Sequence, residues 1–138
     1  MSERLQEVAS QVIGRKFDKG LNALSPREQV LFLAWCYAGE LDNGGIAQFF
    51  CNSCGEHAAE TVAALRVLDL NDLAAILEEA SAALFPEGPA QDIDERNEQM
   101  GANELVDEKM LDAWNRRSYA SGGGDRVYER LDHWYFES

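Results

Sequence analysis

Apolar residues recur at helical spacing along most of the chain, and no run of β-branched residues alternates with polar ones. The first helix should end near Gly20. Its apolar stripe consists of Leu5, Val8, Ala9, Val12 and Ile13. We therefore predict an all-α fold, built as a single compact domain of about six to eight helices over residues 1–138.

A second helix is marked by the signals at its start. Ser25 is a favourable N-cap residue, Pro26 suits the first helical position, and Glu28 completes a capping box. Residues 30–38 are apolar on nearly every side, as in a helix that is surrounded by neighbours. We expect this helix to lie at the centre of the core.

The next two helices are predicted to be amphipathic with an acidic outer face. The inward positions of residues 56–68 and 72–84 are apolar, whereas outward positions carry acids. The prolines Pro86 and Pro89 break this pattern. Residues 92–98 follow as an acidic loop or a short helix.

Two further helices are predicted in the C-terminal part, one over residues 103–119 and one from Asp125 onward. The glycines at 122–124 between them favour a flexible joint. This part is rich in aromatic residues, namely Trp114, Tyr119, Tyr128, Trp134, Tyr135 and Phe136. They fit either the core or a dimer interface, where Tyr, Trp and Arg are enriched.

A sharp turn is indicated at residues 42–45, ahead of a short helix over residues 46–53 that ends at Gly55. Gly44 and Gly45 permit backbone angles that are closed to other residues, so we expect the chain to reverse there. We expect a corner between two helices at this point.

Three amides lie around this corner. Asn43 is placed to cap the following helix. Gln48 and Asn52 are four residues apart on one helix face, where their amides bond each other or satisfy a neighbouring backbone group. One interpretation is a structural corner with buried amides, and the other is a binding role for Gln48 or Asn52.

Charge is concentrated in the middle of the chain. Residues 36–112 hold seventeen Asp and Glu but only three bases, Arg66, Arg96 and Lys109, in a protein of net charge −13. Nucleic acid and anionic membranes would be repelled by this segment, so we predict no direct contact with either. A partner that is steered by charge should be a basic protein.

The stretch from Glu40 to Gly55 resembles the signature of a family of acidic, all-helical domains known from the C-terminal domain of DNA-mimic proteins, long labelled as having unknown function. The family pattern reads E-x-x-N-G-G-x-x-Q-F-F-x-N-x-x-G. It is matched here by Glu40, Asn43, Gly44, Gly45, Gln48, Phe49, Phe50, Asn52 and Gly55. The resemblance continues more loosely and covers about residues 25–90.

This resemblance implies a non-enzymatic homodimer whose surface carboxylates imitate duplex phosphates and sequester a basic DNA-binding protein or transcriptional regulator. Duplex DNA carries about one charge per 1.7 Å of axis, so fourteen net charges in residues 36–112 match about 24 Å of duplex. The candidate partner-binding acids are Glu56, Glu60, Asp72, Glu78, Glu79, Asp92, Asp94, Glu95 and Glu98.

Two alternatives to DNA mimicry stay open. The same charge distribution fits an immunity protein or antitoxin that neutralises a basic toxin such as a nuclease. It also fits a plain solvated acidic face on an ordinary protein.

No residue pattern indicates catalysis or a cofactor. Cys51, Cys54 and His57 offer ligand types for zinc, but no second close Cys or His pair completes four ligands. A nucleophile pair of Cys54 with His57 lacks a marked oxyanion hole or orienting acid. Residues 92–103 lack the glycine and the glutamate of a calcium loop. We therefore predict no enzymatic activity, no cofactor and no metal site.

Compartment signals favour the cytoplasm. The first four residues contain no apolar signal core, and the longest apolar run, residues 30–38, is too short to cross a bilayer. Three cysteines in a chain without export signals fit reduced thiols better than a disulfide framework.

Overall fold

The computed structural model describes residues 1–137 and contains, over that range, eight α-helices, two short 3₁₀-helices and no strand. The helices are α1 (Glu3–Lys19), η1 (Leu21–Ala23), α2 (Pro26–Gly44), α3 (Ile46–Cys51), η2 (Ser53–His57), α4 (Ala58–Val67), α5 (Asn71–Leu84), α6 (Ile93–Ala102), α7 (Glu108–Ala120) and α8 (Gly123–Glu137). The predicted all-α single domain and its number of helices are confirmed. No helix of the described part is long and apolar enough to span a membrane.

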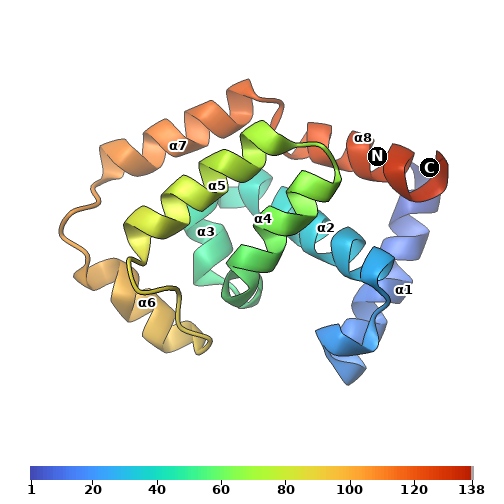
Figure 1. Ribbon diagram of the computed structural model, residues 1–138, viewed down its shortest axis with the longest axis horizontal. Helices are drawn as coiled ribbons and strands as arrows, with labels where there is room; N and C mark the ends of the chain where they lie inside the picture. The colour runs from blue at the N-terminus through green and yellow to red at the C-terminus, as the bar shows by residue number, and fades with distance from the viewer. Residues whose placement is uncertain (138) are drawn as a thin grey trace.

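Helix α2 is the centre of the fold, as its apolar sequence predicts. It packs against α1, α3, α4 and α8 (Figure 1). Its start is fixed by the predicted capping box, in which the Ser25 hydroxyl accepts from the Glu28 amide and the Glu28 carboxylate accepts from the Ser25 amide. The buried residues of α2 therefore lie on several faces of the helix, each covered by a neighbouring helix.

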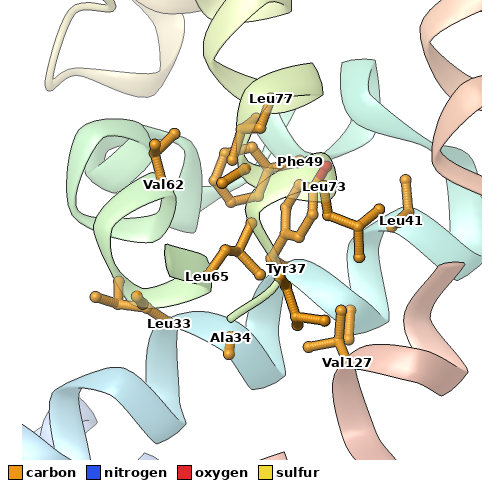
Figure 2. Packing of buried hydrophobic residues seen from close by; sticks show 14 of the residues in the cluster. Leu33, Ala34, Tyr37, Leu41, Phe49, Val62, Leu65, Leu73, Leu77 and Val127 are labelled. Carbon is orange, nitrogen blue, oxygen red and sulfur yellow. The ribbon is translucent and has the colours of Figure 1, made fainter. Parts of the chain in front are cut away.

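The core lies where α2, α3, α4, α5 and α8 meet. Figure 2 shows Tyr37 of α2 close to Phe49 of α3, with Leu65 and Leu73 from the α4–α5 pair beside them. The Tyr37 and Phe49 rings meet edge to face with centroids 5.1 Å apart, a favoured arrangement for buried aromatic rings. These contacts hold the short α3 against the central helix.

The amphipathic pair α4 and α5 agrees with the predicted pattern, because the inward positions of both helices are buried. The helix that was predicted over residues 103–119 starts later than expected, at Glu108 of α7. Asn103 leaves the helical path and donates to the Ala83 and Leu84 carbonyl oxygens, and Asp107 caps α7. The acidic stretch at residues 92–98 is helical from Ile93 onward and forms the first part of α6, which continues to Ala102.

The glycines at 122–124 do not form a flexible joint, so that prediction is wrong. Gly123 begins α8, and both Gly123 and Gly124 are buried. The Gly124 amide donates to Asp42 Oδ1 at 3.0 Å, and a Cβ atom at Gly124 would lie only 2.3 Å from Asp42 Oδ2. Glycine is needed there for a close approach between α8 and the end of α2.

The corner between α2 and α3 is tighter than predicted. Helix α2 continues to Gly44, and the chain reverses at Gly45, whose φ of 85° favours glycine. The prediction that Asn43 caps α3 is wrong. The Asn115 side chain of α7 does so instead, since its Oδ1 accepts from the Ile46 amide at 2.9 Å. Helix α3 ends at Cys51 rather than Ser53.

Candidate acidic interface

All nine carboxylates that the sequence nominates are exposed, but they belong to three groups on different elements. One group lies on α5, one on η2 and α4, and one at the start of α6 and along it. In that order, the groups are Asp72, Glu78 and Glu79; Glu56 and Glu60; and Asp92, Asp94, Glu95 and Glu98. Their surroundings differ, and so does their availability to a partner.

The α5 group is neutralised by bases from other helices. Arg126 of α8 forms an ion pair with Asp72 at 2.7 Å, and Arg66 of α4 forms one with Glu78 at 3.3 Å. Partial burial opposes ionisation of Asp72, but the Arg126 guanidinium and the Leu73 amide hold its pKa below its usual value. These acids already have intramolecular partners.

Glu79 is the most strongly engaged acid of the α5 group. Its carboxylate accepts from the Arg117 guanidinium and from Trp114 Nε1, the latter at 2.8 Å. These two hydrogen bonds from α7 lower the pKa of Glu79. Glu79 therefore helps to fix α7 on α5.

Glu56 and Glu60 stand with Glu78 at the rim of an open groove of about 540 Å³. The groove runs between α4 and α5, and Phe85 and neighbouring apolar side chains line it. Glu56 Oε1 lies 3.1 Å from Nε2 of its neighbour His57. Within residues 1–137, Glu60 has no ion pair.

The α6 group remains unpaired. Asp92 caps the helix by accepting from the Glu95 amide at 3.0 Å, which leaves its negative charge at the favourable N-terminal end. Asp94, Glu95 and Glu98 form no ion pair with any residue of the described chain. All three side chains are exposed to solvent.

Arg96 is the unexpected residue of α6. It lies among acids in the sequence, yet none of its surface is exposed. Its guanidinium donates only to backbone carbonyl oxygens, at 2.7 Å to Phe50 and 2.6 Å to Asn52 from one side, and to Ala90 and Gln91 from the other. It therefore fixes α6 to the end of α3 and neutralises no surface carboxylate.

We define the acidic segment as residues 87–108, which comprise α6, its flanking loops and the first residue of α7, drawn in yellow and orange in Figure 1. Its only base is the buried Arg96. Eight carboxylates of this segment are exposed and form no ion pair within residues 1–137. They are Glu87, Asp92, Asp94, Glu95, Glu98, Glu104, Asp107 and Glu108. The segment is thus a surface of a single charge.

The corner motif is held together by one carboxylate. Glu40 Oε2 accepts from Gln48 Nε2 at 3.1 Å and from Asn52 Nδ2 at 2.6 Å, so the two amides bond Glu40 rather than each other. Phe49 and Phe50 are buried in the core. The Glu40 bonds and the buried rings agree with a structural corner, but the predicted burial of the amides is wrong, because Gln48 is half-buried and Asn52 is exposed.

The Cys and His residues around η2 do not converge on one point. Cys51 is exposed, Cys54 is half-buried, and His57 contacts Glu56. Within the described residues, no group of three or more His, Cys, Asp or Glu side chains is arranged to hold a metal ion.

The C-terminal aromatic residues have several roles. Trp114 is buried, and Tyr119, which is 47 % exposed, donates through its hydroxyl to the Leu41 carbonyl oxygen at 2.7 Å. The Arg27 guanidinium lies over the rings of Trp134 and Tyr135, at 5.2 and 5.1 Å from their centroids. Packing within the chain therefore uses much of this cluster.

A family model described as DMP19-like protein matches residues 22–138, which include the corner motif and the acidic segment. The chain belongs to the DMP19-like protein family. The match covers α2 to α8 and begins after the end of α1. Neither the search of curated proteins nor the search of solved structures found a match.

Four acids of this DMP19-like protein join the candidate interface only through the structure, namely Glu87, Glu104, Asp107 and Glu108. Local pattern gave no reason to prefer them, because they lie in a predicted break and a predicted helix. The absence of a base other than Arg96 between Arg66 and Lys109 was the available signal. Its meaning depends on the burial of Arg96, which the sequence does not reveal.

Proposed function

We propose that this protein acts as a DNA mimic, without catalysing a reaction. In this proposal, carboxylates of the acidic segment occupy the DNA-binding surface of a basic protein, such as a transcriptional regulator, and keep it from DNA. The observation that carries the proposal is the buried position of Arg96, which leaves the surface of residues 87–108 without a base.

The spacing of charge on α6 supports this proposal. The ten residues of α6 span about 15 Å, since an α-helix rises about 1.5 Å per residue. One strand of a duplex places a phosphate about every 3.4 Å, or four to five phosphates over about 15 Å. Helix α6 and its cap carry four carboxylates, at Asp92, Asp94, Glu95 and Glu98.

The fixed position of α6 also favours binding. The helix is capped by Asp92 and tied to α3 by Arg96, so a partner does not have to order it on association. The α5 acids differ, because Asp72 and Glu79 already hold arginines of α8 and α7. We therefore expect the α6 acids to contribute more to binding than the α5 acids.

A pull-down tests this proposal. The immobilised protein is exposed to host lysate, and bound protein is eluted in parallel with salt and with duplex DNA. We expect both eluates to contain the same basic DNA-binding protein. The triple variant Asp94→Lys, Glu95→Lys, Glu98→Lys should lose this capture.

A matched control separates the face from net charge. Glu3, Glu7 and Asp18 of α1 are exposed and form no ion pair with other described residues, so their triple exchange to Lys changes the net charge equally. This control should retain capture. Equal loss of capture in both triple variants would contradict mimicry. Capture of a toxin that DNA does not release would also contradict mimicry and would favour an immunity protein.

A homodimer is also part of the proposal and follows from the family resemblance. The C-terminal cluster around Trp134 is the candidate interface, with part of its surface already used by Arg27. Light scattering on Trp134→Ala should show a lower mass than on the original protein. An unchanged mass would place the interface elsewhere or exclude it.

A further inference from the structure

The groove between α4 and α5 has an apolar surface. The two helices lie side by side (Figure 1), and their short side chains Ala59 and Ala82 are exposed in the groove. Val62 and Phe85 lie beneath, with 8 % and 3 % of their surface exposed, and Pro86 lies at one end of α5. The volume of about 540 Å³ is that of a binding site for a few side chains.

The rim of this groove is acidic on both sides. Within residues 1–137, the ionisable side chains that line the groove are all carboxylates. Glu56 and Glu60 belong to η2 and α4, and Glu78 belongs to α5. Glu78 is 63 % exposed despite its ion pair with Arg66. Cationic groups on either flank of a bound segment are therefore attracted to the rim.

A neighbouring hollow has a different charge. It has a volume of about 570 Å³ and shares Glu56 and Glu60 with the groove, but Lys16 and Lys19 of α1 also line it. These two ammonium groups repel a basic segment. Charge therefore directs such a segment to the groove between α4 and α5.

We propose that this groove binds a basic amphipathic helix of a partner protein. Apolar side chains of the size of leucine enter the groove, and Lys or Arg side chains on both flanks pair with the carboxylates of the rim. Amphipathic helices bind apolar grooves in this way. The site is separate from the α6 acids, and the inference does not rest on the proposed DNA mimicry.

The test uses a fluorescently labelled peptide and the full-length protein. The peptide is a designed helix of about sixteen residues with leucine at every third or fourth position and lysine on both flanks. A control peptide has alanine in place of leucine and the same charge. In fluorescence anisotropy we expect the leucine peptide to bind about tenfold more tightly, because its longer apolar side chains are buried.

A double variant tests the apolar part of the groove. Ala59→Gln with Ala82→Gln places longer polar side chains in the groove and leaves the net charge unchanged. Both alanines are exposed on helices, so the fold should persist, which circular dichroism checks. Binding of the leucine peptide should weaken about tenfold. The control is Ala102→Gln with Ala120→Gln, at exposed helical alanines outside the groove, and it should bind normally.

A second double variant tests the acidic rim. Glu56→Gln with Glu60→Gln should weaken binding roughly threefold at low salt, and the difference should shrink at high salt. Glu3→Gln with Glu7→Gln removes the same charge from exposed positions of α1 and should have little effect.

Three results would overturn the proposal. The first is equal affinity for the leucine and alanine peptides. The second is equal binding by the groove variant and its control. The third is loss of peptide binding in the triple exchange of Asp94, Glu95 and Glu98 to Lys but not in the groove variant, since the peptide would then lie on α6. Failure to capture a DNA-binding protein from lysate would contradict only the proposed DNA mimicry.

Discussion

The Nε atom of Arg96 donates a hydrogen bond to the carbonyl oxygen of Phe50 at 2.7 Å. This contact joins α6 to the last turn of α3, across forty-six positions of the sequence. It turns the one base of the acidic segment toward the interior. The same residue thus fixes the segment in place and leaves its surface purely acidic.

Replacing Arg96 should therefore destabilise the protein strongly. Arg96→Ala leaves four buried or partly buried carbonyl oxygens without this donor, and we expect the free energy of unfolding to fall by about 3–5 kcal/mol. Arg96→Lys should lose less, although an ammonium group does not reproduce the guanidinium fork. Urea unfolding measures both.

Arg116→Ala is the control for this experiment. Arg116 is exposed and bonds only a carbonyl of its own helix, so its loss should stay within about 0.5 kcal/mol. Arg96→Ala and Arg116→Ala of equal stability would contradict the structural role of Arg96.

Two glycine substitutions should act in opposite directions. A Cβ atom at Gly55 would lie 2.7 Å from Phe50 Cα and 2.8 Å from the Phe49 carbonyl oxygen, so Gly55→Ala should cost about 1–3 kcal/mol. A Cβ atom at Gly14 of α1 meets nothing within 4 Å. Gly14→Ala should stabilise by about 0.5–1 kcal/mol. Thermal unfolding gives both signs, and a stabilising Gly55→Ala would show that the corner is looser than described.

The Glu40 carboxylate should contribute more to the free energy of unfolding than an exposed acid does. Glu40→Ala removes the shared acceptor of Gln48 and Asn52, and we expect a loss of about 1.5–3 kcal/mol. Glu60→Ala, at an exposed position with no ion pair in residues 1–137, is the matched control and should be near neutral. The melting temperatures of the two variants test this expectation. Equal values would show that the Glu40 carboxylate contributes no more than an exposed acid.

Glu79 should contribute stability that depends on pH. Hydrogen bonds from Arg117 and Trp114 lower its pKa in the folded state below the ordinary value of 4.5. Its contribution is therefore fully present above that value and is lost as the pH falls through the lowered pKa. The pair is exposed, so the effect should be at most about 1 kcal/mol.

Glu79→Gln tests this dependence because glutamine resembles the protonated acid. The variant should be less stable than the original protein at neutral pH, and the difference should vanish once the pH falls below the lowered pKa of Glu79. Glu78→Gln, whose partner Arg66 lies at 3.3 Å on an exposed surface, should show a smaller difference at neutral pH. A Glu79→Gln difference that persists in acid would contradict the assigned hydrogen bonds.

Much of the fold could be predicted from local pattern. The capping box of Ser25, the apolar faces of α4 and α5, and the end of α1 at Gly20 depend on residues close in sequence. The incorrect predictions concern contacts between residues that are far apart in the sequence. Asn115 rather than Asn43 caps α3, because the side chain that accepts from the Ile46 amide comes from another helix, α7.

The candidate site was less predictable for the same reason. Arginine is rarely buried without a carboxylate, so the position of Arg96 among acids favoured an exposed side chain. The pairing of Glu79 with Arg117 depends on how α7 crosses α5. From charge counts alone, Glu79 and Glu98 were both predicted to belong to one partner-binding acidic face. In the structure, Glu79 forms an ion pair with Arg117, whereas Glu98 forms none within the described residues.

The most direct test of the account is competition for the captured partner. The partner is bound to a fluorescently labelled duplex, and fluorescence anisotropy follows the label as the protein is added. We predict that the protein releases the duplex, that the triple exchange of Asp94, Glu95 and Glu98 to Lys abolishes release, and that the matched α1 triple does not. A partner that binds this protein and the duplex together would contradict DNA mimicry.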